Sequence, residues 1–169
     1  MPITRTLEPL RISDLPEVGE LARAIWRQHY TSIISSAQIE YMLRNKYTPT
    51  DLEPYVDSPD RWFDILRVQG TPSGFLRTAR ASQDEFRLEE IYVVKDLRGK
   101  GYGKLLLDRA ESLAREQRCK SMFLSVNRAN AGSIAAYLRN GFIVRESKVF
   151  DIGHGFVMDD HIMEKSLAT

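Results

Sequence analysis

The sequence has few of the residues that crosslink a chain or bind metals. It contains one cysteine, Cys119, and three histidines at positions 29, 154 and 161. A lone cysteine cannot form an internal disulfide, and these histidines lack the spacing of a metal site. We therefore expect no metal, and a reducing, cytoplasmic compartment.

A strong charge imbalance and long apolar runs are also missing. Lysine and arginine total 24 and aspartate and glutamate total 23, so the formal net charge is +1. This balance argues against a nucleic-acid partner or an anionic membrane surface. No apolar run approaches the roughly 18 residues of a membrane span, and the N-terminus lacks the apolar core of a signal peptide. A length of 169 residues with 43% hydrophobic residues fits one globular domain.

Apolar spacing predicts a mixed α/β domain. Residues 4–10 alternate weakly like a strand, and helical spacing begins after Ser13-Asp14 and again after Ser36. A short helix or turn is expected between Thr48 and Pro59, and residues 70–74 have turn composition. The remaining predicted elements are strands over 62–68, 75–81 and 86–94, a helix over 103–118, a strand over 121–126, a helix over 130–140, and strands over 142–150 and 156–164. The order is β-α-α-β-β-β-α-β-α-β-β.

The segment Arg98-Gly99-Lys100-Gly101-Tyr102-Gly103-Lys104 lies between a predicted strand and a predicted helix. Its glycines let the backbone approach a ligand, and the amides of the loop and of the first helical turn together form an anion site. Four basic residues against one acidic residue over positions 95–104 suit a pyrophosphate. Lys104, Leu105 and Leu106 exclude the dinucleotide fingerprint and the P-loop. A surface turn that caps a helix is the structural alternative.

This loop, the strand Leu88-Glu89-Glu90-Ile91-Tyr92-Val93, and the later pattern of Asn130, Tyr137 and Gly141-Phe142 together resemble the GNAT acetyltransferase superfamily. The match is most specific from residue 88 to residue 142. The resemblance implies a mixed, mostly antiparallel sheet flanked by helices, and acetyl-CoA as cosubstrate. It implies one domain over 1–169, in which 1–61 wall the acceptor, 62–142 bind acetyl-CoA and 143–169 form C-terminal strands.

The resemblance also implies roles for individual residues. Tyr137 matches the tyrosine that protonates the leaving thiolate, although a core aromatic is the alternative. The N–H of Val93 is the candidate that polarises the thioester oxygen. The base is Glu89 or Glu90, with Glu89 preferred; as the alternative, both are solvated or pair with Arg77, Arg80 or Arg87. The implied cofactor-binding residues are Tyr92, Val93, Val94, Arg98, Gly99, Lys100, Gly101, Tyr102, Gly103, Lys104, Asn130, Ser133, Ala136, Tyr137 and Arg139.

The implied function is direct transfer of an acetyl group from acetyl-CoA to a primary amine. The acceptor is a small molecule, a polyamine or a peptide or protein amine. Glu89, Glu90, Asp159 and Asp160 favour a cationic acceptor by charge complementarity. The alternative is a non-catalytic module that binds acyl-CoA as a sensor or regulator. Relatives often dimerise through their C-terminal strands, which leaves a homodimer open.

Overall fold

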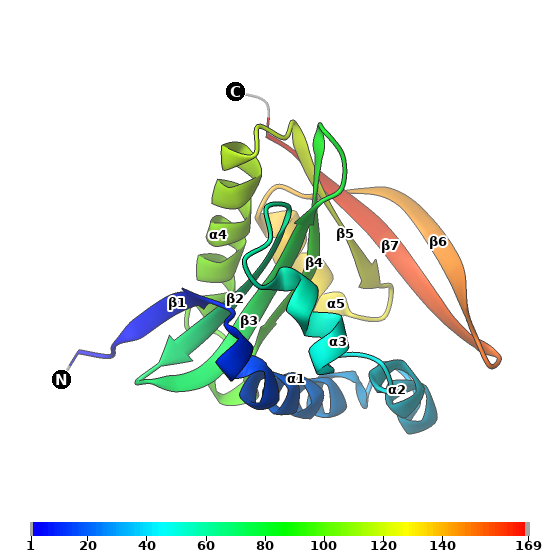
Figure 1. The fold of residues 1–169 in the computed structure, drawn as a ribbon. Coiled ribbons are helices and arrows are strands. Elements are labelled where there is room, and N and C mark those ends of the chain that lie inside the picture. Colours follow the sequence, from blue (N-terminus) through cyan, green and yellow to red (C-terminus); the bar gives the residue numbers. More distant parts are fainter. Residues whose placement is uncertain (1, 168–169) are drawn as a thin grey trace. The chain divides into compact units, whose positions relative to one another are not determined.

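The computed structural model describes residues 2–167 and divides the chain into two compact units. Unit 1 comprises Met1–Ala79 and Glu89–Ala110, and unit 2 comprises Arg80–Leu88 and Glu111–Thr169. The strands are hydrogen-bonded in the order β1-β2-β3-β4-β5-β7-β6 (Figure 1). Strand β4 contributes residues to both units. The single domain over 1–169 stays a prediction.

The predicted order of elements is confirmed, and the short helix or turn expected between Thr48 and Pro59 is a short helix followed by a 3₁₀ turn. Unit 1 contains β1 (Arg5–Pro9), α1 (Leu15–Tyr30), α2 (Ser36–Leu43), α3 (Pro49–Leu52), β2 (Arg61–Val68) and most of β3 (Thr71–Arg80). The strand β4 (Glu85–Val93) and the helix α4 (Tyr102–Glu116) cross between the units. Unit 2 contains β5 (Ser121–Asn127), α5 (Ala131–Arg139), β6 (Ile143–Gly153) and β7 (Phe156–Ser166). The 3₁₀ turns are η1 (Ile12–Asp14), η2 (Glu53–Tyr55) and η3 (Lys95–Leu97).

The caps of the first two helices differ from the predicted ones. Ser35, one residue earlier than expected, caps α2, because its Oγ accepts a hydrogen bond from the Gln38 amide at 3.1 Å. Asp14 precedes α1, but its carboxylate accepts from the Arg11 amide at 2.9 Å and pairs with Arg67 at 3.3 Å. Asp14 therefore fixes the η1 turn and ties it to β2.

The hairpin turns are shorter than the glycine composition suggested. The β2–β3 turn consists of Gln69 and Gly70, whose φ angles are 53° and 77°. Two consecutive left-handed residues are typical of a tight two-residue hairpin. The predicted turn over 70–74 is therefore wrong beyond Gly70, since Pro72 and Gly74 belong to β3. The β6–β7 turn is likewise confined to His154 and Gly155, and the expected loop over 151–155 shortens accordingly.

Gly74 is required by a neighbouring strand. A Cβ atom at this position would lie 2.5 Å from the carbonyl oxygen of Tyr92. Real Cβ atoms do not approach a backbone oxygen this closely, so only glycine lets β3 come this near to β4. The sequence suggested a turn here because glycine is common in both settings.

Unit 1 has a core between its helices and strands. Val18 and Ala22 of α1 and Ile65 of β2 have no exposed surface, and the rings of Phe63 and Phe75 stack with centroids 5.2 Å apart. Each fully buried valine, isoleucine or phenylalanine side chain stabilises the fold by about 1.5–3 kcal/mol relative to exposure. This core supports α1 and α2 as a fixed wall beside β4.

Unit 2 forms a mixed sheet. β5 pairs in parallel with Glu85–Arg87 of β4 and antiparallel with β7, which also pairs antiparallel with β6. Met122, Leu124 and Val126 are buried on one face of β5. Lys165 lies on that same face, at the register position of Met122, and its ammonium pairs with Glu111 of α4 at 2.9 Å. The predicted sheet, mixed and mostly antiparallel, is confirmed.

Among residues 2–167, no helix has both the length and the apolar character needed to cross a membrane.

Candidate active site

The turn between β4 and α4 has an open, amide-rich shape. Gly99 and Gly101 have φ angles of 75° and 88°, and a Cβ at position 99, 101 or 103 would meet no atom within 4 Å. The protein's own side chains therefore do not fill the space beside these three glycines. The segment can accept a ligand close to its backbone, as the glycine pattern predicted.

The start of α4 presents unpaired helical amides. The first intrahelical bond joins the Leu105 amide to the Gly101 carbonyl at 3.1 Å. The amides of Tyr102, Gly103 and Lys104 precede this bond and so lack an acceptor within the helix. The Tyr102 side chain is buried, which leaves its backbone as the part that can meet a ligand. Such amides and the positive end of the helix dipole suit a diphosphate.

The basic side chains of the turn do not all point outward as free charges. The Arg98 Nε donates to the Val93 carbonyl at 3.0 Å, so this side chain closes the turn on itself. Lys104 pairs with Asp108 one helical turn later at 2.9 Å. Lys100 is exposed. The local positive charge is therefore lower than the composition suggested, and the backbone amides carry more of the anion site.

The backbone groups at the end of β4 are partly committed. The Val94 amide donates to the Ser73 carbonyl at 2.9 Å, and the Val94 carbonyl accepts from the Leu97 amide at 3.0 Å. Val93 is buried and lies one residue after Tyr92, whose carbonyl faces Gly74. The amide of Val94 is therefore already used within the protein, and its carbonyl has one acceptor position occupied.

Glu90 lies at the centre of a buried ionic network. Its carboxylate accepts from Arg77 of β3 at 3.2 Å and from the hydroxyl of Tyr47, and the Lys46 ammonium lies 3.7 Å away. Arg77 also forms two 2.9 Å hydrogen bonds with the carboxylate of Asp51. Glu90 is only 7% exposed. Its ion pair with Arg77 is the alternative that the sequence left open, and its two carboxylate oxygens are both engaged by neighbouring side chains.

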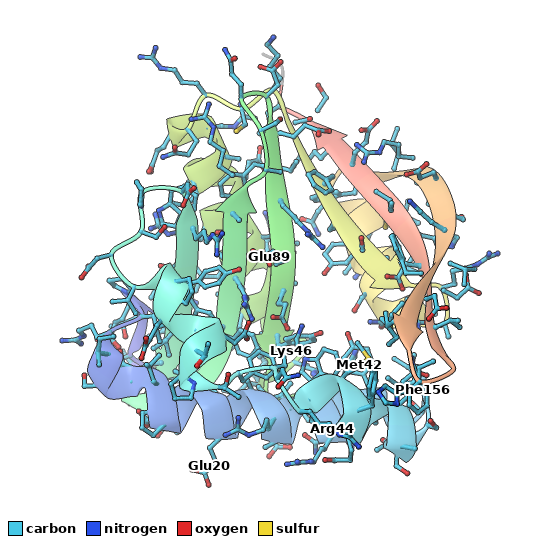
Figure 2. The ribbon with its side chains drawn as sticks, turned by 45° about the vertical axis from the view of Figure 1, so that its right-hand side comes forward. Glu20, Met42, Arg44, Lys46, Glu89 and Phe156 are labelled. Carbon is cyan, nitrogen blue, oxygen red and sulfur yellow. The ribbon has the colours of Figure 1, made fainter. Side chains whose placement is uncertain are left out.

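Glu89 has a different environment although it is adjacent. It is partly exposed, and its Oε1 accepts a hydrogen bond from the Tyr55 hydroxyl at 2.6 Å. Among residues 2–167, no lysine, arginine or histidine forms an ion pair with Glu89. Figure 2 shows Glu89 on β4 and Lys46 in the segment between α2 and α3. Burial and the bond to Glu89 raise the pKa of Tyr55 to about 12, so this phenol stays a donor to the carboxylate.

An aromatic cluster lies beside the end of β4. The hydroxyls of Tyr30 and Tyr92 are 2.6 Å apart, and the Trp26 ring contacts Tyr30 with centroids 4.4 Å apart. Burial, followed by the electrostatic influence of Tyr30, Tyr47 and Glu90, raises the pKa of Tyr92 well above its ordinary value. Burial and the positive charge of Arg98 lower the pKa of His29, so this histidine is neutral at pH 7.

Unit 2 carries the predicted residues of α5. Asn130 is buried directly before the helix, and Tyr137 is 9% exposed with its ring edge toward Phe142 at 5.7 Å between centroids. Ser133 and Ala136 are partly exposed, and Arg139 is exposed. Gly141 ends the helix region with a φ angle of 94°, as its position predicted. The roles of these residues stay predictions.

Sequence reasoning missed the supports of Glu89 and Glu90. Tyr47, Asp51 and Tyr55 lie between α2 and β2. Tyr47 is 43 positions before Glu90, and Tyr55 is 34 positions before Glu89. Asp51 is 26 positions before Arg77. No local pattern marks them, because the contacts depend on how β3 and β4 pair. Among residues 2–167, no group of three or more histidine, cysteine, aspartate or glutamate side chains has the arrangement of a metal site.

Comparison with known proteins identifies the family. The sequence profile of the acetyltransferase (GNAT) family matches residues 20–142. The spermidine N(1)-acetyltransferase of Thermoplasma acidophilum is 28% identical over 157 residues, which cover 90% of this chain and 94% of that protein. The streptothricin acetyltransferase of Streptomyces lavendulae is 33% identical over 87 residues, which cover 51% of this chain and 46% of that protein.

A solved structure agrees with this assignment. The PaiA N-acetyltransferase of Thermoplasma acidophilum, solved in complex with coenzyme A, superposes with a TM-score of 0.79 and 26% sequence identity. The match covers 96% of this chain and 99% of that one. The open turn at Gly99–Gly103 and the free amides of α4 fit the diphosphate of such a cosubstrate. The chain belongs to the acetyltransferase (GNAT) family and is an acetyl-CoA-dependent N-acetyltransferase.

Proposed function

We propose that the chain transfers an acetyl group directly to a primary amine of a small cationic acceptor. The observation that carries this proposal is the carboxylate of Glu89, which is partly exposed and has no cationic partner among the described residues. It lies on β4 four residues before Val93. Acetyl-CoA, when bound, supplies an acetyl group activated as a thioester.

The chain's own groups have separate tasks in this proposal. The amides of residues 99–104 hold the diphosphate, and the N–H of Val93 donates to the thioester oxygen as negative charge develops there. Asn130, Ser133, Ala136 and Arg139 border the cofactor along α5. A fixed backbone donor of this kind needs no reorganisation during the reaction, so it favours the transition state over the ground state.

Two proton transfers accompany the acetyl transfer. An amine is mostly ammonium at pH 7 and must lose a proton before it attacks. Glu89 accepts that proton through a water molecule, because its carboxylate is open whereas that of Glu90 is engaged by Arg77 and Tyr47. Tyr137 donates a proton to the leaving thiolate, since a phenol with a pKa of about 10 and a thiol with a pKa of about 8.5 can share it.

The similarity to a spermidine acetyltransferase supports a small cationic acceptor over a peptide. The match covers 94% of that relative. A peptide or protein amine is the alternative. The cytoplasmic location and the homodimer stay predictions.

A free-thiol assay with acetyl-CoA and a panel of amines, polyamines, amino acids and peptides tests the proposal. We expect turnover with small cationic amines and slower turnover with peptides. Calorimetry that shows tight coenzyme A binding, together with no turnover on any amine, would favour the non-catalytic acyl-CoA module instead. Turnover restricted to peptides would contradict the proposed acceptor class.

A further inference from the structure

Asp160 of β7, in unit 2, has a buried carboxyl group with one oxygen that lacks a hydrogen-bond partner in the described part of the chain. The residue is 6% exposed, and its Oδ1 has no hydrogen-bond partner among residues 2–167. Burying a carboxylate without a partner is costly, so proteins keep such groups neutral or pair them with a cation. The missing partner therefore points to a ligand.

The register of the sheet places Asp160 at the end of β5. Asp160 lies opposite Asn127, the last residue of β5, and β7 lies between β5 and β6 (Figure 1). The chain continues from Asn127 through Asn130 into α5, the helix that carries Tyr137. Asp160 is thus next to the strand end from which the predicted cofactor helix begins.

The side chain of Asp160 also lies on the face of the sheet away from the helices of unit 2. Lys165 contacts Glu111 of α4, and a Cβ at Gly141 after α5 would lie 3.3 Å from the Lys165 Cε. The β5–β7 register is regular from position 160 to position 166, so side chains five residues apart point to opposite faces. The cross-strand neighbours on the Asp160 face of β5 are Asn127, Ser125 and Phe123, which are partly exposed.

The lysine that lies opposite Asp160 across the strand pair is directed elsewhere. Lys148 of β6 lies directly opposite Asp160, yet its ammonium lies over the Phe150 ring, 5.1 Å from the centroid. Arg128 pairs with Asp159 at 3.6 Å. Burial, and then the charge of Asp159, raise the pKa of Asp160, while His161 opposes the rise.

We propose that Asp160 binds the non-reacting ammonium of a di- or polyamine acceptor. This inference rests on the proposed acetyl transfer and adds the residue that selects a second positive charge. A carboxylate would repel the phosphates of coenzyme A, so the acceptor is the ligand whose charge it suits. A charge-assisted hydrogen bond to a buried carboxylate contributes about 1.5–3 kcal/mol, enough to discriminate a diamine from a monoamine.

The test uses the full chain with Asp160→Asn and, as a matched control, Asp151→Asn. Both variants remove one negative charge from the β6–β7 strand pair, but Asp151 is exposed on β6 and its carboxylate accepts a hydrogen bond from the Gly153 amide at 2.8 Å. Calorimetry with α,ω-diamines of three to six carbons, spermidine and n-butylamine is run in the presence of coenzyme A. Steady-state kinetics with acetyl-CoA uses the same amines.

For Asp160→Asn we expect Kd and KM for the diamines and spermidine to rise on the order of tenfold or more, which corresponds to loss of one charge-assisted bond. The kcat, the values for n-butylamine and the affinity for coenzyme A should change less than about threefold. Asp151→Asn should leave all of them near wild type. The melting temperature of Asp160→Asn without ligand should rise, because a group kept for binding leaves an unpaired charge in the apo protein.

Several results would overturn the assignment. The first is an equal loss of affinity for diamines and for n-butylamine in Asp160→Asn, and the second is an equal effect of the two variants. The others are weaker coenzyme A binding by Asp160→Asn and a lowered melting temperature of Asp160→Asn. No diamine binding by wild type would also overturn it. Failure of the proposed acetyl transfer is distinguishable from failure of this assignment. In that case wild type would bind diamines without releasing thiol, and Asp160→Asn would bind them more weakly.

Discussion

The hydroxyls of Tyr30 and Tyr92 lie 2.6 Å apart and join the last turn of α1 to β4. Tyr92 directly precedes Val93, whose amide is the proposed donor to the thioester. The bond therefore ties the wall of the proposed acceptor site to the strand that presents this amide.

Replacing Tyr30 by phenylalanine should lower the free energy of unfolding by about 1 kcal/mol, because the hydroxyl of Tyr92 loses its partner. The Tyr92→Phe variant should cost a similar amount, and the double variant should cost less than the sum. Urea unfolding of all four proteins measures this coupling. Additive losses would show that the two hydroxyls do not stabilise each other.

Gly101→Asp should weaken coenzyme A binding on the order of tenfold or more, because a carboxylate would stand where the diphosphate meets the helix amides. Gly70→Asp is the matched control, since Gly70 has a φ angle of 77° against 88° at Gly101 and also faces open space. Calorimetry and thermal unfolding separate binding from folding. Tight binding by Gly101→Asp, or equal weakening by both variants, would contradict the assigned anion site.

Tyr137→Phe should lower kcat by about a hundredfold, as expected when a general acid is removed, and should change coenzyme A affinity much less. The phenylalanine ring retains the contact with Phe142. Single-turnover kinetics with acetyl-CoA isolates the chemical step. Full activity of this variant would return Tyr137 to the role of a core aromatic.

The two glutamates of β4 should respond differently to the same substitution. Glu89→Gln should lower kcat at least about tenfold at pH 7, with stability preserved. Glu90→Gln should lower the free energy of unfolding by about 1–3 kcal/mol, because Arg77 loses a buried charged partner. Activity profiles and urea unfolding of both variants make the comparison. The reverse pattern would assign the base to Glu90.

The Asp51–Arg77 pair should make stability depend on pH below neutrality. Burial opposes ionisation, but the hydrogen bonds from Arg77 and the Tyr47 amide, with the charges of Arg77 and Lys46, lower the pKa of Asp51 below its ordinary value of 3.8. Around and below this pH the unfolded chain binds more protons at this site than the folded one, so stability falls as pH falls.

The wild type should therefore exceed Asp51→Asn in unfolding free energy most at pH 5 and above, and the difference should shrink toward pH 3. The exposed Asp57, replaced in the same way, serves as the control. Denaturant unfolding across this pH range measures the difference. A constant difference between wild type and Asp51→Asn would show that the pair contributes no linked protons.

The sequence predicted what local patterns determine. Periodicity gave the order of elements, and the glycines at 99, 101 and 103 marked the anion turn because their spacing lies within one loop. The network of Tyr47, Asp51, Arg77 and Glu90 was not predictable, since its members come together only through strand pairing. Gly74 was misassigned for a related reason, as its requirement comes from Tyr92, eighteen positions later.

The close approach of Gly74 to the Tyr92 carbonyl joins two main chains with no side chain between them. The spacing of β3 and β4 at this point is set by backbone geometry alone. It therefore does not change when substitutions alter the volume of aliphatic side chains in the core. The position of the Val93 amide, one residue further along, is therefore also unaffected by such changes in the core. A homologue that keeps a glycine at this point can vary widely around it and still present that amide in the same place.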